Sequence, residues 1–187
     1  MSAQTTTRGN DADLAENANG AQRLHTTELA NEIEFLTARA RSLGSGRANN
    51  MLAELDLKVR SYSVLSLACS GENPSQRELA DFLSLDPSQI VALVDQLEQR
   101  GAVTRETDPR DRRSKVIVAT TAGRNLYKRA EGIIRRAEDQ SLSTLSPQER
   151  ETLRDLLKRI EQNQAKAKVI YDFLDGSLPE FERLQQA

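Results

Sequence analysis

The sequence contains few of the residues that most often build metal sites and nucleophilic active sites. It has one cysteine, Cys69, and one histidine, His25, among 187 residues. A lone cysteine excludes an internal disulfide and a cysteine-clustered zinc site, and a lone histidine near a polar N-terminus argues against Cys–His and Ser–His catalysis. The sequence also lacks a glycine-rich phosphate loop. We therefore expect no catalytic residues, no metal, no cofactor and no enzymatic activity.

Long apolar segments are missing as well. No run reaches 18 apolar residues, so no transmembrane helix is expected. The first 20 residues lack the basic start and apolar stretch of a secretory signal, which favours a cytoplasmic protein with no membrane partner. Aromatic residues make up only 4% and charged residues 29%, a composition typical of helix-rich proteins with long solvated faces.

The net charge does not by itself indicate a nucleic-acid partner. Lysine and arginine total 26 and aspartate and glutamate 28, a formal charge of −2. The distribution is uneven, however. From Arg105 to Lys115 the chain has five cations against three anions. A positive potential concentrated in one segment is better suited to a DNA contact than the total charge suggests.

Apolar spacing and turn residues divide the chain into segments. Residues 1–25 are polar and are expected to form a disordered tail. Spacings of three and four predict helical structure over 26–58, interrupted at Gly44-Ser45-Gly46, and another helix from about Val59 to Ser70. Three further helix starts have capping-box spacing, with an N-cap oxygen three residues before a Glu or Gln. They lie at Ser75, Asp86 and Ser146.

Residues 59–120 have the pattern of a winged helix-turn-helix. The helices from Ser75 and Asp86 are joined by only a few residues, and the small Ala80 is placed where two helices would cross. Two β-prone segments, 102–106 and 114–119, then predict a hairpin with a long loop. Further helices are expected over 121–165, followed by an extension, 166–187, that could form another helix. The expected fold is mainly α with a small β-hairpin wing.

The segment LSLDPSQIVALVDQLEQRGAVTRETDPRDRRSKVIVATTAGR resembles the DNA-binding part of MarR-type transcriptional regulators. The matching features are a recognition helix ending VDQLEQRG, Asp-x-Arg at Asp111 and Arg113, and Thr-x-x-Gly from Thr120 to Gly123. The resemblance covers roughly residues 29–165. It departs from the family pattern at Ala119, where the family usually has Leu, and at Val91 and Ala92, where polar or basic side chains are frequent.

This resemblance implies a transcriptional regulator that binds double-stranded DNA as a homodimer. In the family, the first helix and the last two interlock across a two-fold axis, so 26–58 and 121–165 become dimerisation regions. Such regulators are most often repressors that a small molecule relieves. The residues also favour a C2 dimer, because the apolar stripe of the C-terminal helices is large for one small domain. The stripe consists of Leu126, Ile133, Ile134, Leu153, Leu156 and Ile160.

Two half-sites about one helical turn (~10 bp) apart would make the operator a pseudo-palindrome. On the recognition helix, Ser88 and Gln89 are candidates for base or phosphate contacts, although Gln89 could instead close a capping box onto Asp86. The side chains of Val91 and Ala92 could meet thymine methyl groups or be simple filler. The last two candidates are phosphate contacts that general surface polarity explains nearly as well. They are Ser75 and Gln96.

In the wing, Asp111 and Arg113 are expected to pair with each other or with neighbouring backbone and so stiffen the turn. Arg112 or Arg113 would then enter the minor groove, and Arg110 would contact phosphate. The alternative is a solvated surface turn. Two further arginines, Arg100 and Arg105, are expected to form flanking pairs or phosphate contacts.

Cys69 has no adjacent cation in the sequence, so a small buried apolar role is favoured over a redox sensor. The family resemblance also implies a possible small aromatic or anionic effector. Arg39, Arg60 and Tyr62 could line its crevice, although Tyr62 also continues the apolar face of its helix. The competing interpretation of the whole chain is a winged-helix protein-interaction or structural module that does not bind DNA.

Overall fold

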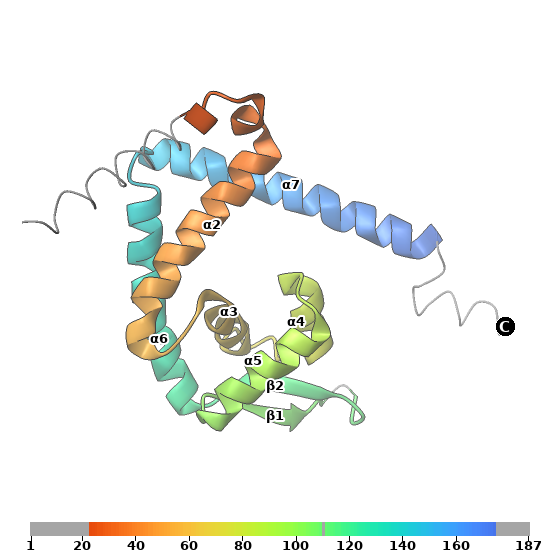
Figure 1. Ribbon diagram of the computed structural model, residues 1–187. Coiled ribbons are helices and arrows are strands. Elements are labelled where there is room, and N and C mark those ends of the chain that lie inside the picture. The colour runs from red at the N-terminus through yellow and green to blue at the C-terminus, as the bar shows by residue number, and fades with distance from the viewer. Residues whose placement is uncertain (1–22, 110, 175–187) are drawn as a thin grey trace, which may run out of the picture. The chain divides into compact units, whose positions relative to one another are not determined.

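We describe the protein from a computed structural model over residues 23–109 and 111–174, with side chains through residue 163 (Figure 1). The chain divides into two compact units, one ending at Ser141 and one beginning at Leu142. The elements of the first unit are η1 (Glu28–Asn31), α2 (Ile33–Leu52), η2 (Ala53–Leu55), α3 (Val59–Ala68), α4 (Gln76–Leu83), α5 (Pro87–Gln99), β1 (Val103–Thr107), β2 (Lys115–Ala119) and α6 (Thr121–Ser141). The described part of the second unit contains α7 (Pro147–Leu174). The fold is mainly helical with a two-stranded antiparallel hairpin, as the sequence predicts.

Helix α2 is continuous through Gly44 and Gly46, so the predicted interruption there is wrong. Each glycine costs a helix about 1 kcal/mol relative to alanine. Packing along α6 offsets this cost (Figure 1), and the last turns of α2 bury Ala48 and Leu52. The helix also begins later than predicted, because residues 28–31 form a short 3-10 helix.

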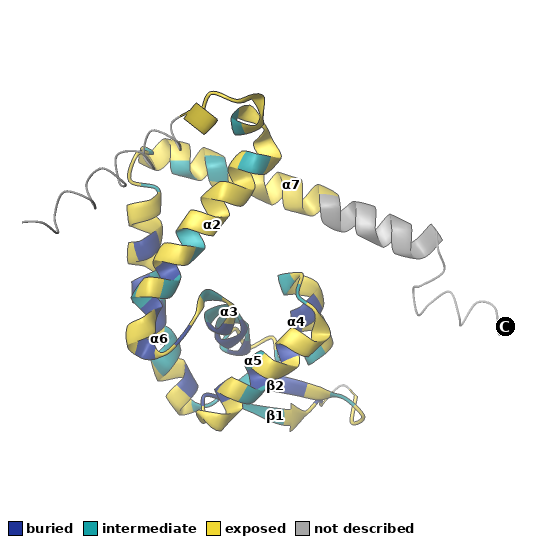
Figure 2. Cartoon of the chain, in the orientation of Figure 1, coloured by how far each residue is buried: buried dark blue, intermediate teal, exposed yellow. Residues whose placement is uncertain are grey.

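One hydrophobic core holds the first unit together (Figure 2). Helices α2, α3, α4 and α5 and strand β2 each contribute at least one large side chain with no more than 1% exposure. These are Leu52 of α2, Leu65 of α3, Leu79 of α4, Ile90 and Leu97 of α5 and Ile117 of β2. The core therefore fixes the hairpin and the helix pair α4–α5 relative to α2 and α3.

The C-terminal apolar stripe differs from the prediction. Ile133 is buried within the protomer, and Leu126 and Ile134 pack against the same core, because α6 lies along α2. Only part of the stripe is therefore available to a partner. The large apolar side chains left about half exposed or more on η1, α2 and α7 are Leu29, Ile33, Leu36, Leu43, Leu156, Leu157 and Ile160.

Local hydrogen bonds explain the helix starts. Ser75 begins α4 with a complete capping box, because its Oγ accepts from the Glu78 N–H and Glu78 Oε2 accepts from the Ser75 N–H at 2.7 Å. Ser146 and Glu149 form the same reciprocal pair before α7. Helix α7 then continues to Leu174 without a break. The extension expected after residue 165 thus begins as part of α7 and not as a separate helix.

A tight turn joins α4 to α5. Its residue Ser84 adopts the left-handed conformation (φ 51°), and the Leu85 N–H donates to the Ala80 carbonyl oxygen at 3.0 Å. Ala80 is only 6% exposed at this crossing. The two helices therefore meet across a turn that a small residue at position 80 permits, as helix-turn-helix packing requires.

The hairpin is anchored on both sides of β2. Val103 pairs with Ala119 and Thr107 with Lys115, so the two strands run in register along their whole length. On its other edge, β2 bridges to Ser75, and the Ile117 N–H donates to the Pro74 carbonyl oxygen at 2.8 Å. The base of the wing is thereby fixed to the start of α4.

Candidate nucleic-acid interface

The exposed face of α5 carries no cation. Its sequence, PSQIVALVDQLEQ, contains two acidic residues and no lysine or arginine. Ile90, Val94 and Leu97 are buried, and the opposite face is exposed. The exposed residues of this helix include five that the sequence marked as candidate DNA contacts. They are Ser88, Gln89, Val91, Ala92 and Gln96.

The first turn of α5 differs from the predicted capping box. The Asp86 carboxylate accepts from the Ser88 N–H at 2.7 Å and from the Ser88 hydroxyl at 2.5 Å. These hydrogen bonds hold the pKa of Asp86 below its usual value. The Gln89 side chain makes no hydrogen bond back to the Asp86 N–H, so the capping box is not closed. Its amide is therefore exposed and available to a ligand.

The wing turn is organised by Asp111. Its carboxylate accepts from the Arg113 N–H at 3.0 Å and from the Ser114 hydroxyl at 3.1 Å, and its carbonyl oxygen accepts from the Ser114 N–H. Asp111 was expected to pair either with the Arg113 side chain or with neighbouring backbone, and the structure shows the pairing with backbone. Arg112 and Arg113 are exposed. Within the described residues, neither guanidinium has a hydrogen-bond or ion-pair partner. Arg110 lies outside the described residues.

Unlike Arg112 and Arg113, Arg105 of β1 is engaged within the protein. Its Nη2 lies 2.5 Å from Asp95 Oδ1, its Nη1 bonds the Glu98 carboxylate, and its Nε donates to Gln76 Oε1 at 3.3 Å. Burial lowers the pKa of Arg105, but Asp95 and Glu98 outweigh that effect and raise it above its usual value. Arg105 therefore forms a flanking pair, and the positive charge of the wing lies nearer its tip.

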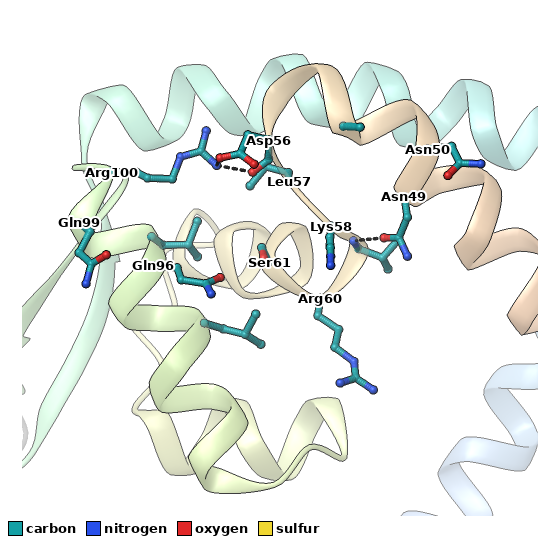
Figure 3. A pocket seen from close by; sticks show the side chains of 14 residues that line it. Asn49, Asn50, Asp56, Leu57, Lys58, Arg60, Ser61, Gln96, Gln99 and Arg100 are labelled. Atoms are coloured by element: carbon teal, nitrogen blue, oxygen red, sulfur yellow. Dashed lines mark hydrogen bonds and ion pairs between the residues drawn. The ribbon is translucent and has the colours of Figure 1, made fainter.

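Arg100 ends α5 in a comparable way. Its guanidinium donates to the carbonyl oxygens of Asp56 at 2.6 Å and Leu55 at 2.8 Å, with the exposed Asp56 carboxylate 3.9 Å away (Figure 3). These bonds join the C-terminal end of the recognition helix to the segment that connects α2 to α3. A displacement of that segment would therefore move the C-terminal end of α5 through these hydrogen bonds.

A cavity of about 840 Å³ lies beside this joint, between the end of α2, the start of α3 and the C-terminal half of α5 (Figure 3). Its polar lining includes Lys58, Arg60 and Gln96. Asn49 also lines it, but its Oδ1 accepts from the Val59 N–H at 2.8 Å and so caps α3.

Two other kinds of site are absent from the described residues. They contain no cluster of three or more side chains that could bind a metal ion, and none of their helices has the length and hydrophobicity of a membrane span.

Comparison with known proteins identifies the family. The MarR family model matches residues 57–115. A MarR-family transcriptional regulator from Rhodococcus sp. RHA1 is 40% identical, with a TM-score of 0.67 over 72% of this chain and 97% of that one. The chain belongs to the MarR family.

Two other relatives agree with this assignment. CouR from Rhodococcus jostii RHA1, solved bound to p-coumaroyl-CoA, is 42% identical with a TM-score of 0.66 over 72% of this chain and 95% of that one. A Thauera aromatica protein named for transcriptional regulation of the hcr operon is 36% identical over 99 residues, which are 53% of this chain and 60% of that protein. The MarR-family protein described here is thus a DNA-binding transcriptional regulator and not an enzyme. The family binds DNA as dimers.

The predicted DNA contacts on α5, the exposed arginines of the wing and Ser75 all lie in the winged segment 59–120. Ser75 is half-buried in its capping box. The predicted effector residues are not brought together. Arg60 lines the cavity, but Arg39 and Tyr62 do not. The Tyr62 ring stacks on Tyr127 at 5.8 Å between centroids, because it continues the apolar face of α3 onto α6.

Sequence reasoning missed the partners of the two flanking arginines. Arg105 reaches Gln76, 29 positions earlier, and Arg100 reaches Leu55, 45 positions earlier. No periodicity relates such distant positions. The only sequence signal was charge balance, since two acidic residues on a helix expected to face DNA require a compensating cation.

Proposed function

We propose that this MarR-family protein is a cytoplasmic repressor that binds a pseudo-palindromic operator as a homodimer and releases it when a small molecule binds. The observation that carries the proposal is the wing tip. Arg112 and Arg113 are exposed and without partners among the described residues, on a turn that Asp111 holds in shape. Arginine side chains presented in this way fit a narrow, electronegative minor groove.

The homodimer is supported by the exposed apolar side chains at the N-terminal side of the protomer and on α7. Ile33 is 76% exposed and Leu43 63%, and Leu156, Leu157 and Ile160 are each about half exposed. Burying such side chains in a symmetric interface is the commonest solution for a soluble protein. In this proposal, residues 26–58 and 121–165 dimerise, and residues 59–120 bind DNA.

Base recognition is assigned to the uncharged face of α5. Gln89 and Gln96 present amides that could bond adenine bidentately, and Val91, which is 44% exposed, could pack with Ala92 against thymine methyl groups. Ser88 and Ser75 lie at helix N-termini, where a hydroxyl can reach a phosphate oxygen. Arg110 is assigned to phosphate on its place in the sequence alone.

The effector is assigned to the cavity beside Arg100. Lys58 and Arg60 favour an anionic ligand there. The relative solved with p-coumaroyl-CoA supports an aromatic acid or its thioester. Occupation of the cavity would press on the end of α5 through the Arg100 hydrogen bonds, and the angle of the recognition helix would change.

The proposal is tested by selecting duplexes that the wild-type protein retains from a random-sequence library and titrating the selected duplex by gel shift. Arg113→Ala is expected to weaken binding by about 1 kcal/mol or more and to lower the salt slope by about 1. The matched control is Arg23→Ala, since Arg23 is exposed and lies outside the segments assigned to DNA binding and dimerisation. Unchanged affinity for Arg113→Ala would refute the wing assignment, and failure to retain any duplex would refute the function.

The effector part is tested by titrating p-coumaroyl-CoA and salicylate into the complex of protein and selected duplex. Release by either compound, at a higher concentration for Arg60→Ala than for wild type, is the expected result. If both compounds release DNA equally well from the variant and the wild type, the cavity is not their site.

A further inference from the structure

The recognition helix carries two acidic side chains and no basic one, and a single arginine outside the helix pairs with both. Asp95 lies three and four positions after Ala92 and Val91, so it shares their face of α5. Glu98 follows one turn later, and the side chains of Asp95 and Glu98 are 48% and 41% exposed. Two carboxylates on a helix that approaches DNA would repel the phosphates.

Arg105 occupies the space between these carboxylates. Its guanidinium contacts both of them, and its backbone N–H also donates to Glu98 Oε1 at 3.3 Å. The side chain is 24% exposed, and Gln76 of α4 accepts from its remaining nitrogen. All the nitrogens of the guanidinium are therefore engaged with side chains of α4 and α5.

The strand positions this guanidinium. Arg105 pairs with Ile117 in the middle of the hairpin, and Ile117 is fully buried and bonded to Pro74. The arginine backbone is therefore fixed relative to α5 by the core. An Arg side chain donates to two carboxylates from separate nitrogens of a planar, pre-organised fork, whereas a lysine donates from a single nitrogen on a flexible stem.

We infer that Arg105 is a charge-masking residue. It neutralises part of the charge of Asp95 and Glu98 and so reduces the repulsion between the recognition helix and the DNA phosphates, without contacting DNA itself. The inference rests on the proposed DNA-binding function. The cluster of one cation and two anions has a formal charge of −1, and loss of Arg105 would leave −2 on the face of α5. Arg105 is thus a positioning residue for DNA binding.

The test compares three proteins on the duplex selected by wild type and on a scrambled duplex of the same length. They are the wild type, Arg105→Gln, and a neutral variant that combines Arg105→Gln with Asp95→Asn and Glu98→Gln. The formal charge of the cluster is then −1, −2 and 0. Thermal melting of each protein shows whether it is folded, and Arg105→Met, which also removes the charge, replaces Arg105→Gln in both variants if the latter does not fold.

We expect Arg105→Gln to bind the selected duplex at least about fivefold more weakly, the change in Kd that ~1 kcal/mol produces. The neutral variant should recover the wild-type affinity or exceed it. The salt slope should be the same in all three proteins, because no phosphate contact is lost. If Arg105 had a purely structural role, the neutral variant, which lacks the ion pairs altogether, would bind the selected duplex no more tightly than Arg105→Gln.

Two results would overturn the inference. A salt slope that falls by about 1 in Arg105→Gln, with no recovery in the neutral variant, would make Arg105 a direct phosphate contact. Equal affinities of Arg105→Gln and wild type would show that nothing needs masking. Failure of the wild type to bind either duplex would instead count against the proposed function, so the two failures are distinguishable.

Discussion

Gly123 packs directly onto the backbone of Ala102, so closely that a Cβ on the glycine would lie 1.9 Å from the Ala102 carbonyl oxygen. The contact is made where β1 begins and α6 starts. Thr120 reinforces it, because its hydroxyl donates to the Gly101 carbonyl oxygen at 2.6 Å and accepts from the Gly123 N–H at 3.0 Å. The Thr-x-x-Gly motif thus joins the wing to the long helix that follows.

Substitution of Gly123 by alanine should therefore be strongly destabilising. The added methyl group meets backbone, which cannot move aside cheaply, and overpacking of this kind costs about 1–3 kcal/mol or more. Urea unfolding measures the effect. Gly132→Ala is the control, because a Cβ at Gly132 would meet only the Arg136 side chain at 3.8 Å. Equal stability of Gly123→Ala and wild type would contradict the close approach.

Gly46 lies in the middle of α2 with nothing within 4 Å of a Cβ built on it. Alanine there should stabilise the protein by about 0.5–1 kcal/mol, because it removes the entropy cost of a helical glycine without a clash. Thermal and urea unfolding at fixed protein concentration would show the gain. A loss of stability would mean that another surface approaches the helix at this position.

The Tyr62 phenol is expected to titrate late. Burial, followed by the influence of Tyr127, raises its pKa from 10.0 to about 12. The folded state therefore keeps the proton that the unfolded state releases first, and this contribution to stability is complete below pH 10 and is lost as the pH rises to 12. Unfolding free energies of wild type and Tyr62→Phe should converge over that range. A constant difference between them would show that Tyr62 has an ordinary pKa.

Cys69 should be a poor redox sensor. Burial raises the pKa of its thiol, and the charge of Arg124 opposes the shift only partly. The thiolate is the reactive form, so a disulfide reagent should modify Cys69 much more slowly in the folded protein than in urea. Peroxide should leave DNA affinity unchanged in wild type and in Cys69→Ala alike. Peroxide-dependent release from DNA in wild type alone would assign Cys69 a sensing role.

The local features of the fold were predictable because they depend on neighbouring residues. The capping boxes of Ser75 and Ser146 need only a carboxylate three positions later, and the winged pattern needs only a tight turn followed by β-prone segments. The continuity of α2 was not predictable in this way. Two glycines favour a break, and only the packing of α6, more than 70 residues later, overrides them.

In the candidate site, too, the contacts between neighbouring residues were predictable and the long-range contacts were not. The turn held by Asp111 involves residues two and three positions apart, so its short-range pairing could be anticipated. The partners of Arg100 and Arg105 lie tens of residues away and depend on how the helices meet. The cavity likewise arises from α2, α3 and α5 together, so its lining could not be read from the spacing of residues within one helix.

Because β2 is anchored on both edges, the scaffold of this regulator is held independently of the wing turn. Ser75 and Pro74 secure one edge of the strand and β1 the other, so the position of β2 does not depend on the turn that joins the two strands. An engineer could exchange that turn for one of another length or composition and keep the scaffold intact. Sister regulators made in this way would keep the α5 face and differ only in how the wing meets the minor groove.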